Sequence, residues 1–371
     1  MKKTLFKALS VLRAFLFLLP AVVGLLLYWI LPHYPAFTEA VFSRGIFRLI
    51  SVPLGMVSSL FPFSLTEIAA VAALPALVFL LIRFLRRMKK AESRARLMAK
   101  AGKAVGWTLS SALLLYMLLH GLNFNRLPAS ELMELDTSAK SPEFLQAVCI
   151  DLAQNASAIR KELPQDDNGN VTLDGSITDV LWRAGQGYEA LEEQYPFLWG
   201  VVNRGKRVHL SPLWSYTGIT GMYFPFFAEA NVNTDQPACD IPVTAAHELA
   251  HTRGFAREDE CNFYACLACF HHPSADYRYS GYLMAYIYCS NALYAYDQEL
   301  WLATRAYCSQ GMQADLLQRN EYWEKHEGRV QEISESINNS FIEIQGDDDG
   351  VLSYDRVVEL LLAYYEKEAL V

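Results

Sequence analysis

Residues 244–265, TAAHELAHTRGFAREDECNFYA, contain two histidines four positions apart, with a glutamate between them. In an α-helix, residues i and i+4 lie on the same face, so His247 and His251 can reach one metal ion. Glu248 would then lie beside the metal rather than on it, where it can take a proton from a water molecule. The spacing therefore predicts a helix over 242–254 that carries two metal ligands and a general base.

A third ligand is expected soon after this helix. Gly254 permits a sharp reversal of the chain, and a second helix is predicted over 257–272. Glu258 is the first choice as ligand, because acidic residues suit the first turn of a helix. Glu260 is the second choice, since it points to another side of the helix and could instead cap it or pair with a neighbouring arginine. Asn262, one turn after Glu258, is expected to hydrogen-bond a ligand histidine.

This arrangement resembles the glutamate-type zincins, in which an HExxH helix is followed by a helix with a ligand glutamate, often in an E-x-x-x-D pattern. Here Asn262 takes the place of the second acid, and the gap from His251 to Glu258 is short for that group. The HExxHxxG start also resembles the metzincins, but their third histidine would fall at Arg257. The resemblance implies a Zn2+ site and a peptidase activity with Glu248 as the general base, although another divalent metal stays open.

Three apolar runs precede this region and are long enough to cross a bilayer. They cover 8–31, 64–86 and 105–123. The stretch 46–63 is also apolar, but two prolines interrupt it, so it is predicted as an interfacial or re-entrant piece or as a lead into the second run. The chain is therefore expected to be a multi-pass membrane protein whose partner is the lipid bilayer.

The charge divides at the end of the third run. Residues 1–126 have 16 Lys and Arg against 3 Asp and Glu, whereas 127–371 have a balance of −21. The basic residues gather at the N-terminus and between the second and third runs, so both segments are expected in the cytoplasm. Three spans then place 124–371 outside the cytoplasm. The acidic balance of this part argues against nucleic acid as a partner.

The expected fold class is mainly α with a small β-sheet: a three-helix transmembrane region over 1–123, then a zincin-like α+β domain outside the cytoplasm. Residues 124–142 are predicted as a linker, and 143–371 as the domain. One or two short strands are expected over 206–233. Further helices are predicted over 143–162, 176–194, 279–306, 312–342 and 354–368.

The segment GMYFPFFAEANVN, residues 221–233, comes just before the HELAH helix. It could be an edge strand that pairs with an extended peptide substrate by β-augmentation, or an ordinary core strand. Both interpretations stay open. Glu229 and Asn231 are predicted as turn residues, with substrate contact as the alternative.

Other residues could take part in such a site. Tyr282, in a tyrosine-rich stretch, could donate a hydroxyl hydrogen bond to an oxyanion, but tyrosines at this density usually pack in a core. His209 and the pair His271–His272 are expected to be satisfied histidines rather than ligands. All seven cysteines follow residue 148, and the Cys266–Cys269 pair lies in an apolar stretch, so buried structural thiols are predicted.

Three features together resemble a bacterial membrane family known as domain of unknown function 3810. These are the N-terminal apolar runs, GMYFPFFAEANVN with HELAHTRGFAREDECNF, and the C-terminal stretch NNSFIEIQGDDDGVLSYDRVVELLLAYY. The resemblance covers nearly the whole chain and implies a membrane-anchored zincin-like protein. It supplies no substrate.

The hypothesis is a membrane-anchored zinc metallopeptidase that cuts a peptide or protein at the outer membrane face. Its metal ligands are His247, His251 and Glu258. Two alternatives stay open. One is a non-catalytic binding or sensor protein with a zincin-like domain, and the other is a zinc hydrolase of a cell-envelope amide.

Overall fold

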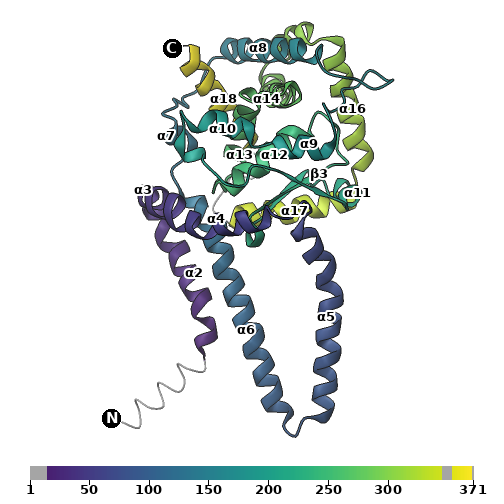
Figure 1. Cartoon of the computed structure of the whole chain (residues 1–371). Helices are drawn as coiled ribbons and strands as arrows, with labels where there is room; N and C mark the ends of the chain where they lie inside the picture. Colours follow the sequence, from purple (N-terminus) through teal and green to yellow (C-terminus); the bar gives the residue numbers. More distant parts are fainter. Residues whose placement is uncertain (1–14, 345–352, 370–371) are drawn as a thin grey trace.

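The computed structural model describes residues 15–344 and 353–369. A helical domain with a small sheet lies on one side, and apolar helices project from its base (Figure 1). The first of these is α2 (Leu19–Ile30), which continues the predicted run 8–31, whose first part lies outside the described residues. The mainly helical class with a small sheet is confirmed.

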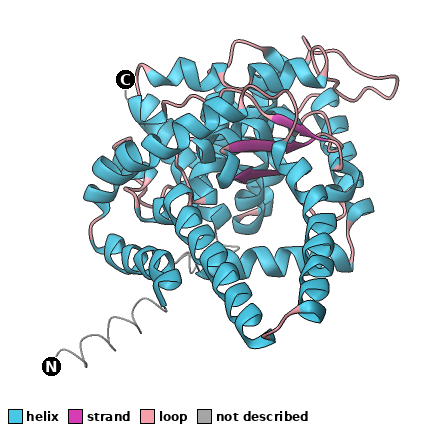
Figure 2. Ribbon diagram, turned by 60° about the horizontal axis from the view of Figure 1, so that its bottom comes forward, coloured by secondary structure: helices cyan, strands magenta, loops and turns pink. Residues whose placement is uncertain are grey.

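Helices α5 (Leu65–Lys90) and α6 (Arg94–Leu119) form a long hairpin below the domain (Figures 1 and 2). They contain the second and third predicted runs. Ser64 caps α5, since its Oγ accepts the backbone N–H of Glu67 at 2.9 Å. Large apolar side chains of α5 point outward, with Leu74 70% exposed. Such a surface is stable only when lipid or a partner covers it.

By length and composition, four helices of the described chain could cross a membrane: Leu16–His33, Pro35–Ser58, Leu65–Lys90 and Arg94–Leu119. The second of them consists of α3 (Pro35–Phe37), the π-helical η3 (Thr38–Ile46) and α4 (Phe47–Ser58). It includes most of the apolar stretch 46–63.

This helix runs across the base of the domain instead of projecting with the others (Figure 1). Nη2 of Arg48 donates to the carbonyl of Phe197 at 2.9 Å. Gly55 permits close packing, because a Cβ there would lie 2.6 Å from Cγ2 of Val202. One side of α4 is therefore packed against the domain.

The stretch 124–142, predicted as a linker, is instead packed against the domain. It contains the end of a 3-10 turn, η4 (Gly121–Asn125), and a short helix, α7 (Ala129–Leu132). Ala129, Met133 and Leu135 are buried in the main core. Its prolines and polar residues predicted a linker, but its apolar side chains join α6 to the domain.

The domain core is formed by helices that surround α12, α13 and α14. Three predicted helices are divided. The helix 176–194 breaks at Gly185, where a Cβ would lie 2.4 Å from Cβ of Asn203, and 279–306 breaks at Asp297, which caps the next helix. The helix 312–342 is split after His326 into α16 and α17. The helices are α8 (Pro142–Arg160), α9 (Ile177–Arg183), α10 (Gln186–Glu192), α11 (Ser211–Ser215), α12 (Ile241–Thr252), α13 (Glu258–Phe270), α14 (Ala275–Tyr296), α15 (Gln298–Thr304), α16 (Gln310–His326), α17 (Arg329–Ile344) and α18 (Ser353–Ala369).

The sheet has three strands rather than one or two. They are β1 (Lys206–Val208), β2 (Gly221–Phe224) and β3 (Glu229–Asn233), in the order β1-β3-β2. Strand β3 pairs in parallel with β1 and antiparallel with β2, with Gly221 opposite Val232. Strand β2 is thus an edge strand, and α12 packs beside it.

Glu229 and Asn231 were predicted as turn residues, but this prediction is wrong. Both are buried members of β3. The Glu229 carboxylate accepts the backbone N–H of Thr66 at 2.9 Å and its hydroxyl at 2.7 Å, and it also pairs with Nζ of Lys206. Oγ of Ser64 donates to Oδ1 of Asn231 at 2.6 Å. A carboxylate is favourable at a helix N-terminus, so these residues hold the start of α5 on the sheet.

Candidate metal centre

The two helices that carry the HELAH motif and the acidic residues meet through a tight reversal. Helix α12 ends at Thr252, and Gly254 has a φ of +85°, a conformation that favours glycine. A Cβ on Gly254 would also lie 2.8 Å from Cε1 of Phe47 in α4. Helix α13 then begins at Glu258, which returns the chain to the face of α12 that carries the histidines.

His247, His251 and Glu258 converge on one point. Nε2 of His247 lies 3.2 Å from Nε2 of His251 and 3.1 Å from Oε2 of Glu258. Nε2 of His251 lies 3.6 Å from Oε1 of Glu258. The ligand atoms of all three lie within 4.8 Å of one another. The structure thus brings together the three residues that the sequence suggested as ligands.

The other nitrogen of each ring is engaged by a neighbour. Nδ1 of His251 lies 2.9 Å from the carbonyl oxygen of Phe255, which can only accept, so this nitrogen carries the proton. Nδ1 of His247 lies 2.8 Å from Oδ1 of Asn262, one turn after Glu258, as expected from the helix period. Both hydrogen bonds fix the ring orientation and leave the two Nε2 lone pairs facing each other.

Two facing lone pairs and a carboxylate form an electronegative cluster that requires a cation. A proton can take that place: burial lowers the pKa of His247, but the hydrogen bond and charge of Glu258 outweigh it and raise that pKa to about 9. Burial likewise raises the pKa of Glu258, but the charges of the two histidines outweigh it and lower that pKa to about 2. Two imidazoles and one carboxylate also match the ligand set of a catalytic zinc site, so the residues fit this metal.

Glu248 is buried between the cluster and the edge strand. Its Oε2 has no hydrogen-bond partner among the described residues. Burial raises the pKa of its carboxyl to about 8, and the charge of His247 and a hydrogen bond from the backbone of Tyr223 oppose this only in part. Gly221 lies directly against the side chain, because a Cβ there would come within 2.4 Å of Oε1. A proton acceptor thus stands beside the cluster without being part of it.

The cluster opens into a cleft of about 1050 Å³. Strand β2 forms one wall, and α14, α16 and α17 contribute the others. Two lining residues, Tyr116 and His120, come from the end of α6, and sequence reasoning missed both. The ring of His120 lies 5.7 Å from that of His251, measured between centroids. No spacing signal in the sequence links these residues to the HELAH motif.

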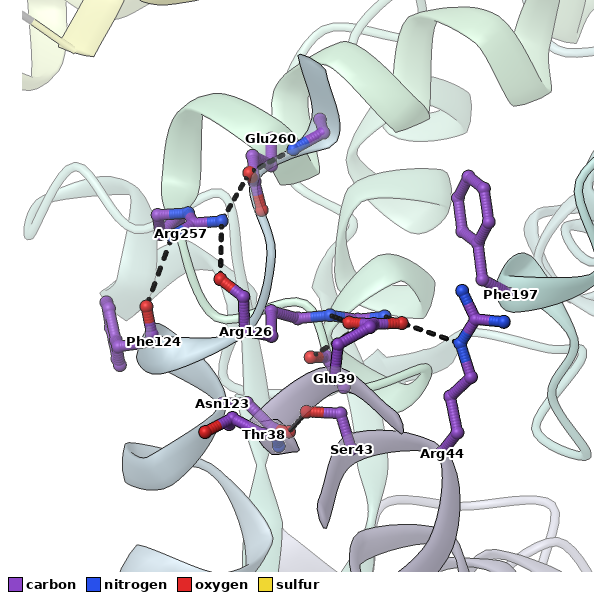
Figure 3. Close-up of polar contacts among 12 residues, drawn as sticks. Thr38, Glu39, Ser43, Arg44, Asn123, Phe124, Arg126, Phe197, Arg257 and Glu260 are labelled. Atoms are coloured by element: carbon purple, nitrogen blue, oxygen red, sulfur yellow. Dashed lines mark hydrogen bonds and ion pairs between the residues drawn. The ribbon is translucent and has the colours of Figure 1, made fainter. Parts of the chain in front are cut away.

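Glu260, the second choice for the third ligand, is not part of the cluster but contacts Arg257 and the start of α7 (Figure 3). Its Oε1 accepts a hydrogen bond from Nη2 of Arg257 at 2.7 Å and one from the backbone N–H of Ala129 at 2.7 Å. It therefore pairs with a neighbouring arginine and caps α7, instead of binding a metal with Glu258.

The reversal between α12 and α13 is held from the side of the N-terminal helices (Figure 3). The buried Arg126 donates to both carboxyl oxygens of Glu39, at 2.7 and 2.9 Å, and to the carbonyl of Gly254 at 2.9 Å. Its guanidinium also lies 3.9 Å from the centre of the Phe255 ring. The helix at the base of the domain thereby fixes the loop that brings Glu258 to the histidines.

Other candidates lie outside the cleft. Tyr282 stacks on Phe270 at 4.4 Å between ring centroids and does not line the cleft; Tyr288, two turns further along α14, does. His209 contacts Glu67, and His272 bonds to the carbonyl of Arg183. All seven cysteines are buried and unpaired, as their apolar setting suggested.

The sequence pattern of one family matches residues 42–362 of the chain, which is most of its length. No curated protein matches the chain, and no solved structure does. The matched range includes α12, α13 and β2, together with the helices α4 to α6 beneath them. The chain therefore belongs to the family described as protein of unknown function DUF3810, the family that its sequence resembles.

Proposed function

We propose that this protein is a membrane-anchored, zinc-dependent metallopeptidase. One observation carries the proposal: the ligand atoms of His247, His251 and Glu258 converge beside a buried carboxyl oxygen of Glu248 that has no partner among the described residues. Zinc held there would supply Lewis-acid chemistry, since it polarises a substrate carbonyl and acidifies water. The zincin resemblance of the sequence supports the same assignment.

The chain's own residues would perform the remaining steps. Glu248 accepts a proton from the attacking water at its free Oε2 and passes it to the leaving amine. The edge of β2 away from β3, which lines the cleft, offers an extended peptide the backbone groups that Glu248 does not use. Asn262 and the Phe255 carbonyl keep both imidazoles in the ligand orientation.

The membrane orientation is also a proposal: α2, α5 and α6 span the bilayer, the N-terminus is cytoplasmic and the domain lies outside the cytoplasm. The turn between α5 and α6 is at the end of the hairpin farthest from the domain (Figure 1). Basic residues flank it, including Arg87, Lys89 and Lys90. Basic loops favour the cytoplasmic side, which supports the orientation. Proteolysis of intact cells should then cut the domain and spare the hairpin turn.

The test combines metal content with catalysis in the purified full-length protein. Wild type and Glu248→Gln should each contain one zinc per chain, whereas His251→Ala should contain none. Peptide libraries should be hydrolysed by the wild type alone. Equal zinc in wild type and His251→Ala would refute the metal site. Zinc binding without hydrolysis, with a cellular role that survives Glu248→Gln, would favour a binding protein, and cleavage of peptidoglycan alone would favour an envelope amidase.

A further inference from the structure

Helix α17 has two sides of different character. One side borders the cleft through Ser334 and Glu335. An adjacent side carries three apolar residues at intervals of three and four, which places them along one face of the helix. These residues are Val330, Ile333 and Ile337, which are 59, 53 and 66% exposed. The cleft wall therefore has an apolar outer face that no described residue of the protein covers.

The position of α17 suggests what covers this face. The helix runs along the base of the domain, the side from which the apolar helices project (Figure 1). Its Gln331 lies against Gly218, where a Cβ would come within 3.3 Å of the Gln331 Cγ. The segment that leads to Gly218 contacts the start of α5 at its other end. There Glu67 of α5 accepts the backbone N–H of Leu210 at 2.7 Å. Helix α17 thus lies at the level where α5 begins.

Further apolar side chains are exposed at this level. Leu213 is in the segment between the start of α5 and Gly218, and it is 62% exposed. Leu60, Phe61 and Phe63, in the connection from α4 to α5, are exposed as well. Scattered apolar residues need no explanation, but a set next to emerging membrane helices does. The α17 face continues the apolar surface of those helices.

We propose that α17 rests on the lipid surface, with Val330, Ile333 and Ile337 among the acyl chains near the headgroups. An amphipathic helix in this position gains from burial of its apolar side while its polar side stays in water. The cleft then lies directly on the membrane, walled by α17 and by Tyr116 and His120 at the end of α6. Its substrate is polypeptide tethered to the same bilayer, cut close to the anchor. This last statement rests on the proposed peptidase function.

The lipid contact can be measured without any catalysis. Ile333→Cys, labelled with a fluorophore in full-length protein in phosphatidylcholine nanodiscs, should be quenched by lipids that carry a spin label on the acyl chain. The native cysteines are buried, which favours labelling at the new site. Leu317→Cys, 59% exposed on α16, is the control and should be quenched several-fold less. Equal weak quenching at both sites would overturn the proposal. Protection of site 333 from both lipid and aqueous quenchers would also overturn it, because it would show that protein covers the helix.

The substrate class is tested with two lipid-linked peptides of the same sequence in the same vesicles. One has a spacer of about 5 residues and the other of about 40, which allow maximal reaches of roughly 17 and 140 Å. The short spacer should be cut at least as fast as the long one. Cleavage of the long-spacer peptide alone would place the site above the membrane and overturn the substrate claim. If neither peptide is cut while unrelated peptides are, the substrate claim fails alone; if nothing is cut, the peptidase function fails, and the quenching result still decides the position of α17.

Discussion

Gly221→Ala should disable the proposed general base without disturbing the metal ligands. A Cβ at this position would lie 2.4 Å from Oε1, 2.7 Å from Cγ and 2.8 Å from Cδ of Glu248, whereas ordinary contacts begin at 3.4 Å. The carboxyl must therefore move by about 1 Å, and a misplacement of this size costs catalysis on the order of a hundredfold. The loss in kcat/KM corresponds to roughly 2.7 kcal/mol of transition-state stabilisation.

The assay is peptide hydrolysis together with zinc analysis of the same preparation. Gly45→Ala is the matched control, because a Cβ there meets nothing within 4 Å, and it should keep wild-type activity. Gly221→Ala should retain zinc, because Glu248 is not a ligand, and should lose kcat rather than zinc affinity. Full activity in Gly221→Ala would refute the placement of Glu248 as the base. Loss of zinc would show that the strand supports the ligands instead.

Three further outcomes are expected. Glu229→Gln breaks a buried ion pair and should lower the unfolding free energy by about 3–5 kcal/mol, which Lys206→Met should partly restore in the double variant; an unchanged thermal midpoint in detergent would contradict the role of β3 in holding α5. Burial lowers the pKa of His272. Its stabilising contribution is therefore complete above the ordinary pKa of 6.5 and falls as the pH drops below that value. Between neutral pH and about pH 5, the thermal midpoint of His272→Asn should fall by less than that of the wild type. A chelator should lower the midpoint of wild type but not of His251→Ala, and equal shifts would argue against a bound metal.

The metal cluster could be predicted because its geometry is local. His247 and His251 share a helix face, and the helix period also separates Glu258 from Glu260. The reversal at Gly254 needed only the backbone freedom of glycine. Within a segment of about sixteen residues, helix geometry fixes the distances between side chains. The convergence of the three ligand atoms could therefore be predicted from the motif.

The remainder of the cleft depends on tertiary packing. Tyr116 and His120 come from the end of an apolar helix, and only the way α6 packs under the sheet brings them to His251. Tyr282 was misplaced because a helix rich in tyrosines gives no sign of which one faces the cleft. Helical periodicity was uninformative where both sides of α14 are buried.

Glu229 and Asn231 show a second limit. Charged and amide side chains are rare in strands, so the segment EANVN favoured a turn. Their partners, Ser64 and Thr66, are more than 160 residues away in the sequence. A buried polar residue can be recognised as structural only when its partner is known, and the partner here is the N-terminus of another helix.

The apolar N-terminal helices and the candidate metal centre form one structural unit. Arg126 binds the carbonyl of Gly254, and Phe47 packs against the same glycine, so the loop that positions Glu258 is supported by the helix at the base. Glu229 would lose the backbone donors of α5 if that helix were removed, which would leave a buried carboxylate with Lys206 alone. The apolar N-terminal helices therefore contribute to the geometry of the candidate ligands, although none of the three comes from them.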